Sequence, residues 1–251
     1  MSGSLAGVRA LVTGGSRGIG RAIAMALADD GARVAFGYHG SREEAEATRD
    51  ELWTRDAAAA AIEADVSRED ECKALVTGAI DVLGGLDVVV NNAGILHEQP
   101  LLDTEVADFD RVIGVNLRGT FLVGRESIRW MVEQGGGGRI INIASDLAYL
   151  GRARNTAYCA SKAGIGAMTR TWALEFAPDI LVNAVGPGPV DTDMLGADVM
   201  SDEQRAQESD IPLRRIGRPD EIAAVAAFLA GPKATFITGQ TFGVNGGSVM
   251  Y

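Results

Sequence analysis

The chain has few cysteines, no long hydrophobic run and no signal-like start, and each shortage excludes a class of protein. Its 251 residues hold two cysteines, Cys72 and Cys159, which cannot form a disulfide framework and lack the spacing of a metal site. We therefore expect free thiols in the reducing cytoplasm. No apolar run is long enough to cross a bilayer. No basic stretch precedes an apolar one at the start, so a signal peptide is not expected.

Positive charge is also in short supply. The net charge of −11 disfavours nucleic acids and anionic membranes as partners. The composition is otherwise that of an ordinary globular protein, with 47% apolar and 23% charged residues. A chain of 251 residues suits one large α/β domain or two small ones.

The most informative stretch lies near the start. Residues 8–12, VRALV, have the apolar character of a buried strand, and Gly14, Gly18 and Gly20 follow at the spacing G-x-x-x-G-x-G. Residues 19–36 then show helical periodicity, a terminating glycine and a second apolar run. Strand, glycine turn, helix and strand make the half-unit that binds a dinucleotide. Glycines let the backbone approach a pyrophosphate, and the helix N-terminus offers free N–H groups with partial positive charge.

Strands and helices alternate along the rest of the chain. Further strands are predicted at residues 57–64, 86–90, 139–144, 180–185 and 242–244, and helices at 41–55, 67–83, 103–134, 155–177, 201–207 and 219–230. Alanines favour helix, but residues 57–64 are short and lie between helices in a βαβ pattern, which favours a strand. Ser41 with Glu44 has the pattern of a capping box, and Ser67 is expected to cap the next helix. Seven strands without linkers or repeats predict one doubly wound parallel sheet, in a single domain.

Three side chains are candidates for chemistry at the carboxyl ends of these strands, where such sheets bind ligands. Ser145 follows a strand, and Tyr158 and Lys162 lie four apart on one face of the next helix. Each residue alone also has a purely structural explanation. A tyrosine and a lysine four residues apart are common on helices, and a serine after a strand usually belongs to a turn or caps a helix. Together, a tyrosine whose pKa a nearby ammonium lowers and a hydrogen-bonding serine could exchange a proton with a carbonyl or alcohol while a cofactor moves a hydride.

The motifs in register resemble the classical short-chain dehydrogenases/reductases over nearly the whole chain. The matching stretches are TGGSRGIG (13–20), DV (65–66), NNAG (91–94), VNLRGT (115–120), Ser145, YCASK (158–162), VNAVGPG (182–188) and Thr192. The resemblance implies a single Rossmann domain, with a cofactor half of about residues 1–135 and a catalytic and substrate half of about 136–251, in a homotetramer. One departure is Gly186, where many members have alanine.

The resemblance also implies a catalytic tetrad. Tyr158 would be the acid–base group, and Lys162 would lower its pKa and bind the nicotinamide ribose. Ser145 would orient the substrate carbonyl, and Asn116 would hold a water that relays protons to Lys162. An inactive, regulatory nucleotide-binding protein on the same fold is the alternative from another class, and it would have a broken tetrad.

The expected cofactor contacts follow from the same resemblance. They are Gly14, Ser16, Arg17, Gly18, Ile19, Gly20, Tyr38, His39, Asp65, Val66, Asn92, Ala93, Gly94, Tyr158, Lys162, Pro187, Gly188, Val190 and Thr192. Among them, Asp65 and Val66 would contact the adenine and Asn92 the ribose side. Val190 and Thr192 would contact the carboxamide.

The choice between the two nicotinamide cofactors depends on the end of the second strand. Many NAD-preferring members have an acidic residue there, which binds the ribose 2′-hydroxyl. Here Tyr38 and His39 occupy that position, with Arg17 and Arg42 nearby. An uncharged residue leaves room for a 2′-phosphate, which arginine suits. We therefore predict NADP(H) over NAD(H), unless both arginines are merely solvated surface charges.

The substrate is less well indicated. Residues 211–223 and 244–247 look most like the 3-oxoacyl-[acyl-carrier-protein] reductase branch, which belongs to fatty acid synthesis. In that branch arginines grip the acidic carrier, whereas this chain has residues 135–138, all glycine, and Pro178–Asp179 at those places. With the net charge of −11, these residues make the carrier protein a doubtful partner. Residues 146–155 and 194–195 are expected to line a pocket for a ketone or secondary alcohol of mixed polarity.

Overall fold

A parallel sheet of seven strands runs through the computed structural model, which describes residues 4–55, 59–196 and 198–250. The strands are ordered β3-β2-β1-β4-β5-β6-β7, and the sheet is doubly wound because the chain crosses from β3 at one edge back to β4 beside β1. Their bounds are β1 Arg9–Thr13, β2 Arg33–Tyr38, β3 Ala59–Glu63, β4 Val88–Asn91, β5 Gly138–Ile143, β6 Ile180–Pro187 and β7 Thr241–Val244. The predicted fold class is confirmed.

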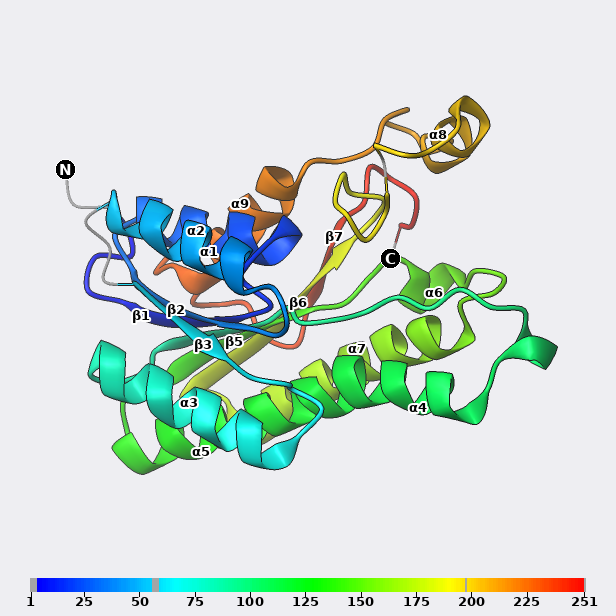
Figure 1. Ribbon diagram of the computed structural model, residues 1–251. Helices are drawn as coiled ribbons and strands as arrows, with labels where there is room; N and C mark the ends of the chain where they lie inside the picture. The colour runs from blue at the N-terminus through cyan, green and yellow to red at the C-terminus, as the bar shows by residue number, and fades with distance from the viewer. Residues whose placement is uncertain (1–3, 56–58, 197, 251) are drawn as a thin grey trace.

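Helices cover both faces of this sheet (Figure 1). The helices are α1 Gly18–Asp29, α2 Arg42–Trp53, α3 Glu69–Leu83, α4 Val106–Ile113, α5 Gly119–Gln134, α6 Leu147–Leu150, α7 Thr156–Phe176, α8 Asp202–Glu208 and α9 Pro219–Ala230. In Figure 1, α1, α2 and α9 lie on one face, and α3, α5 and α7 lie on the other. Among the described residues, no helix is both long enough and apolar enough to span a membrane.

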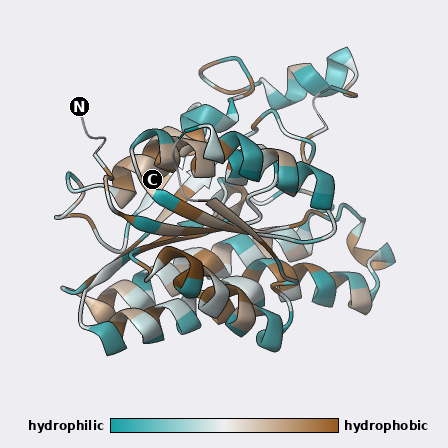
Figure 2. Cartoon of the chain, turned by 60° about the vertical axis from the view of Figure 1, so that its left-hand side comes forward, coloured by the Kyte–Doolittle hydropathy of each residue, from teal (hydrophilic) through white to brown (hydrophobic). Residues whose placement is uncertain are grey.

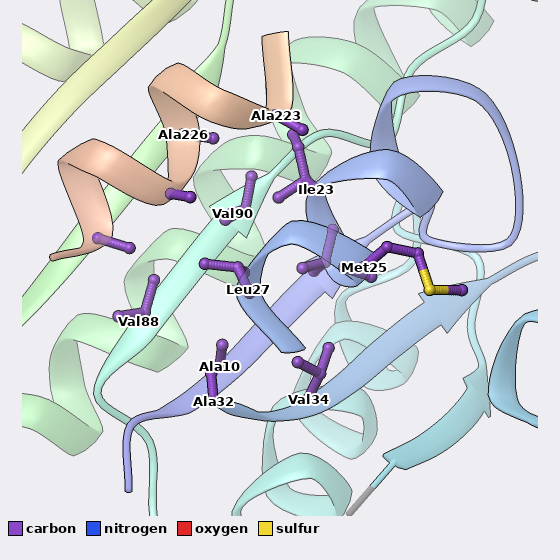
Figure 3. Packing of buried hydrophobic residues seen from close by; sticks show 14 of the residues in the cluster. Ala10, Ile23, Met25, Leu27, Ala32, Val34, Val88, Val90, Ala223 and Ala226 are labelled. Atoms are coloured by element: carbon purple, nitrogen blue, oxygen red, sulfur yellow. The ribbon is translucent and has the colours of Figure 1, made fainter. Parts of the chain in front are cut away.

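The alternation of side chains along the strands divides the core into two layers. Ala10 and Val12 of β1 pack toward α1 and α9, whereas Leu11 between them packs on the opposite face. Figure 3 shows the first layer, in which Ile23 and Leu27 of α1 lie beside the strands and α9. Because both faces are covered, the strands are mostly apolar at their buried centres, and Figure 2 shows brown strands in the middle of the sheet.

The alanine-rich third strand forms where the sequence pattern placed it. The structure has β3 at Ala59–Glu63, in parallel register with β2, and its first residue pairs with Val34. Two of the residues predicted for it, 57 and 58, lie outside the described residues. Pairing with β2 outweighs the helical preference of alanine, because the residues of this edge strand join the parallel ladder of the sheet.

The predicted helical stretch over residues 103–134 is confirmed from residue 106 to residue 134, but it begins later than expected and contains a π-helical turn. The structure has a 3₁₀ turn at Leu101–Asp103, helix α4, a π-helical turn at Gly114–Arg118 and then α5. A π-turn widens a helix by one residue and is common at functional sites. At Gly119, a β-carbon would come within 2.9 Å of the Val66 side chain, so the turn sits tightly against the strand ends.

Two predicted caps are also corrected. Ser41 lies at the N-cap of α2, but its side chain makes no capping hydrogen bond, so the capping box with Glu44 is not formed. The helix α3 begins after Arg68 rather than after Ser67, whose N–H donates instead to Asp65. A capping box does form at Ser201 in α8. The short helix α6 was not predicted.

Candidate active site

The carboxyl ends of the strands open into a cavity of about 1530 Å³. All the residues predicted to contact the cofactor line it, together with Ser145. The predicted pocket residues Met194 and Leu195 also line it, as do most residues of the predicted loop 146–155, where Ala148 and Tyr149 are not among the lining residues. The sheet topology explains this convergence, because parallel strands present their carboxyl ends at one edge.

The glycine turn between β1 and α1 leaves space for a large anionic group. A β-carbon at Gly20 would lie 2.1 Å from the carbonyl oxygen of Gly14, so only glycine allows this close backbone approach. Gly14 and Gly18 have φ angles of 64° and 54°, in the left-handed region. No side chain makes a capping hydrogen bond at the start of α1. The N–H groups of its first turn are therefore not used by a capping residue. These features fit the pyrophosphate of a dinucleotide.

Hydrogen bonds from β4 hold this turn in place. The hydroxyl oxygen of Thr13 accepts the N–H groups of Asn92 and Ala93, each at 2.9 Å. The Asn92 amide donates to the carbonyl oxygens of Thr13 at 2.9 Å and Gly14 at 3.1 Å. The side chain of Asn92 therefore stabilises the turn, and its amide hydrogens are already used within the protein.

The far end of the cavity is lined by the ends of β2 and β3. Tyr38 is the last residue of β2 and is 8% exposed, which confirms where the second strand ends. Asp65 follows β3, and hydrogen bonds from Ser67 outweigh the effect of burial and leave the pKa of its carboxyl lowered. Arg42 pairs with Glu63 at 3.3 Å, and its side chain stays largely exposed.

Arg17 lies at the other side of this end, at the N-cap of α1. It lines the cavity and pairs with Asp193 at 3.6 Å, with both side chains mostly in solvent. An exposed pair of this kind contributes little energy, so Arg17 can exchange its partner for another anion.

The three predicted chemical groups meet at the end of β5. Ser145 follows that strand, and the ammonium group of Lys162 lies 5.6 Å from the ring centroid of Tyr158. Lys162 is 4% exposed and donates to the Ile143 carbonyl oxygen at 2.8 Å. Desolvation lowers the pKa of the Lys162 ammonium to about 8.

The pKa of Tyr158 moves in the direction opposite to the expected one. Burial raises it to about 12, the hydrogen bond with Ser145 opposes this rise, and the charge of Asp146 adds to it. The expectation that Lys162 lowers this pKa is therefore not met. The physical reason is desolvation, which disfavours the charged form of both side chains, the phenolate of Tyr158 and the ammonium of Lys162.

Asn116 is fully buried in the π-helical turn and does not line the cavity. Its side-chain oxygen accepts the N–H of Ile95 at 2.8 Å, and its amide donates to the Ile95 carbonyl at 3.0 Å and to the Ser161 hydroxyl at 3.1 Å. A β-carbon on Gly94 would approach both Asn116 Oδ1, at 3.3 Å, and Lys162 Nζ, at 3.6 Å. Asn116 and Lys162 therefore flank the same glycine.

The substrate side of the cavity has two further polar contacts. Asp146 accepts hydrogen bonds from the hydroxyls of Ser145 and Ser248. Arg152 forms a two-pronged ion pair with Glu208, at the end of α8. This pair joins α8 to the loop that precedes α7, across the cavity that both residues line.

Comparison with known proteins agrees with this geometry. A family model described as enoyl-(acyl carrier protein) reductase matches residues 14–249. A short-chain dehydrogenase/reductase of Armillaria gallica is 43% identical over 256 aligned positions, covering 96% of this chain and 95% of the relative. The chain belongs to the short-chain dehydrogenase/reductase family. This membership confirms the resemblance seen in the sequence motifs.

The chain is also similar to two individual members of the short-chain dehydrogenase/reductase family. The 3-oxoacyl-[acyl-carrier-protein] reductase FabG of Staphylococcus aureus is 44% identical, over 96% of this chain and 98% of the relative. A short chain dehydrogenase of Burkholderia cenocepacia, solved in complex with NADP, is 39% identical with a TM-score of 0.92, over 97% of this chain and 98% of the other.

Sequence reasoning missed the specific contacts on the substrate side of this short-chain dehydrogenase/reductase. It placed Asp146 and Arg152 in the pocket only as members of a lining loop. The position of Asp146 directly after Ser145 was a signal that could have been used. Ser248 and Glu208 gave no such signal, because they lie 102 and 56 residues away in sequence from Asp146 and Arg152.

Proposed function

We propose that the protein is a cytoplasmic NADP(H)-dependent oxidoreductase that interconverts a carbonyl compound and a secondary alcohol. The observation that carries the proposal is the convergence of Ser145, Tyr158 and Lys162 in the cavity that the glycine turn also lines. The nicotinamide cofactor supplies or accepts the hydride. In this proposal both predicted halves of the chain act as one domain, because strands from both contribute to the site.

The chain's own residues handle the proton. In reduction, the Tyr158 hydroxyl donates its proton to the substrate oxygen, and in oxidation the same oxygen takes a proton back. A pKa raised by burial keeps Tyr158 protonated at neutral pH, which suits the donating role. Ser145 orients the substrate oxygen, and Lys162 binds the ribose and restores the proton. Asn116 acts beside Lys162 through a bound water.

The cofactor preference rests on the end of β2. Tyr38 brings no negative charge to the place where a 2′-phosphate would lie, and Arg17 is held by a weak, exposed ion pair. The NADP complex of the similar Burkholderia protein supports the same preference. Arg42 can contribute only by leaving Glu63, its present partner.

A second candidate function is reduction of 3-oxoacyl-[acyl-carrier-protein], favoured by the 44% identity to FabG. Against the carrier as partner stands the turn at residues 135–138, where the Gly138 N–H donates to the Asp179 carbonyl at 3.1 Å. Glycines and Asp179 offer no cation for an acidic carrier at this turn, and the net charge of −11 opposes the encounter. We therefore propose a small-molecule substrate.

The test is a panel of ketones and secondary alcohols, including 3-oxoacyl thioesters both free and on a carrier protein, run with NADPH and NADH. We expect turnover of small molecules with NADPH, and a carrier-bound thioester no better than its free form. Strong preference for the carrier-bound form would replace our proposal with the second one. Binding of NADPH without turnover of any member would favour a regulatory protein instead.

A further inference from the structure

Asp146 is an acidic side chain buried beside the reacting groups. It is 4% exposed and lines the cavity directly after Ser145. An isolated buried carboxylate is costly unless hydrogen bonds or a cation satisfy it. In the described part of the chain no ion pair of Asp146 is found, so hydroxyl and backbone groups provide its surroundings.

Three hydrogen bonds fix the position of this residue. Its Oδ1 accepts from the Ser145 hydroxyl at 3.1 Å and its Oδ2 from the Ser248 hydroxyl at 2.6 Å. Its own N–H donates to the carbonyl oxygen of Pro187, at the end of β6, at 2.9 Å. Asp146 thus connects the catalytic serine to β6 and to the C-terminal segment that contains Ser248.

The contact with Ser145 has a direct consequence for that hydroxyl. A serine has one hydroxyl proton, and here it is directed to Asp146. The Ser145 oxygen also accepts the N–H of Leu147 at 3.1 Å. With the proton and one lone pair both engaged, the hydroxyl does not rotate freely, and its remaining lone pair can accept a hydrogen bond from Tyr158 or from a substrate hydroxyl.

The charge of Asp146 also acts on Tyr158. The charged and titratable groups around the phenol are Asp146 after β5, Cys159 and Lys162 on α7 itself, and Arg152 in the loop between α6 and α7. Of these, Asp146 opposes the formation of a phenolate, and Arg152 is already paired with Glu208. Asn116, from the π-helical turn packed on α7, is neutral.

We propose that Asp146 is a positioning residue, which fixes the Ser145 hydroxyl and places a negative charge in the cavity that Tyr158 also lines. The part that concerns catalysis rests on the proposed function. The part that concerns the ionisation of Tyr158 does not, and it can be measured without a substrate.

The first experiment measures that ionisation in the full-length protein. Tyrosines are replaced biosynthetically by difluorotyrosine, whose phenol ionises at a lower, non-denaturing pH, and ultraviolet absorbance is followed against pH. Subtraction of the Tyr158→Phe protein isolates residue 158. In Asp146→Asn, which removes the charge and keeps the shape, the midpoint should fall by about one pH unit. An unchanged midpoint would overturn this part of the proposal.

Ser248→Ala is the matched control for this titration. It removes one hydrogen bond to Asp146 and leaves the charge in place. We expect the midpoint of Ser248→Ala to differ from that of the wild type by less than about a quarter of the shift seen in Asp146→Asn. An equal shift in Ser248→Ala would mean that local disturbance, rather than the charge, moves the ionisation, and this would also refute the proposal. If Asp146→Asn does not fold, Asp146→Ser removes the same charge in its place, and Ser248→Ala remains the control.

The second experiment tests whether Asp146 acts through Ser145. In a double-mutant cycle, kcat/KM is measured for Asp146→Asn, Ser145→Ala and the double variant, with the best substrate of the panel. We expect Asp146→Asn to lose about tenfold alone and less than about twofold in the Ser145→Ala background. Additive losses would refute an action through Ser145. If the panel yields no substrate, the proposed function fails while the titration still decides the role of Asp146 toward Tyr158.

Discussion

The ammonium group of Lys162 donates a hydrogen bond of 2.8 Å to the carbonyl oxygen of Ile143, the last residue of β5. This contact ties the centre of α7 to the end of a central strand and places the lysine at the floor of the cavity. It leaves a lysine almost wholly out of water, with its pKa lowered to about 8 from 10.5. The buried ammonium lowers the stability of the folded protein, a cost that is common where side chains serve activity.

Lys162→Met should therefore stabilise the protein while abolishing turnover. Below pH 8 the folded protein holds a buried ammonium ion, which methionine avoids, and the gain should be about 1–3 kcal/mol at pH 7. Between pH 8 and 10.5 the folded wild type gives up this proton before the unfolded chain does, so the gain should shrink. Thermal melts across this range measure it. Lys73→Met, at an exposed position, is the control and should show no such pH dependence.

Tyr158→Phe should reduce kcat by at least about 10²-fold, because the ring remains and the transferable proton is lost. NADPH binding, followed by fluorescence, should be nearly unchanged. Tyr149→Phe is the matched control, since Tyr149 lies on α6 but is not among the residues that line the main cavity. Appreciable turnover in purified Tyr158→Phe would remove Tyr158 from its proposed role.

Tyr38→Asp should move the cofactor preference from NADPH toward NADH. The new carboxylate would accept hydrogen bonds from the ribose of NADH and repel a 2′-phosphate, a difference of about 1–3 kcal/mol or roughly 5–150-fold. The measurement is the ratio of kcat/KM for the two cofactors, with Tyr38→Phe as the neutral control. A wild type that already prefers NADH would contradict our reading of the β2 end. A ratio that stays constant in the variant would mean that Tyr38 does not face the ribose.

Glu208→Gln should loosen the segment around α8. The Glu208 side chain is 11% exposed, and its loss of charge breaks the ion pair that joins α8 to Arg152. We expect KM for the substrate to rise about three- to tenfold with a smaller change in kcat, because the pocket wall moves and the proton-transfer groups do not. Faster proteolysis within residues 198–217 should accompany it. Glu203→Gln, an exposed position on the same helix, should leave both quantities unchanged.

We expect a homotetramer in solution. Large apolar side chains remain exposed on the helices of one face, including Phe121 and Val132 of α5 and Leu174 of α7, the last at 88%. We expect partner subunits to cover these side chains of the two long helices. Light scattering should give four times the chain mass of 26.3 kDa. A monomer in dilute buffer would refute the expectation, and Phe121→Glu should lower the mass of a tetramer, whereas Trp53→Glu on α2 should not.

The local patterns in the sequence predicted the sheet and the nucleotide-binding turn. The glycine spacing before α1 predicted a close approach of the backbone. The structure has this approach, because there is no room for a side chain at Gly20. The spacing of Tyr158 and Lys162 places both on one face of a helix whatever surrounds it. Contacts between residues far apart in the sequence were not predictable in the same way. The π-helical turn within the predicted helical stretch is one example, because its Asn116 bonds to Ile95 and Ser161, and helical periodicity predicts neither contact.

The sequence by itself determined the fold class and the order of the motifs, because short-range spacing and backbone sterics govern these. Only the tertiary structure decided how the side chains behave. Burial, which depends on the whole fold, raises the pKa of Tyr158 where the charge of Lys162 was expected to lower it. The contact of Asp146 with Ser248 joins residues 102 positions apart, and only the folding of β6 and the C-terminal segment brings them together.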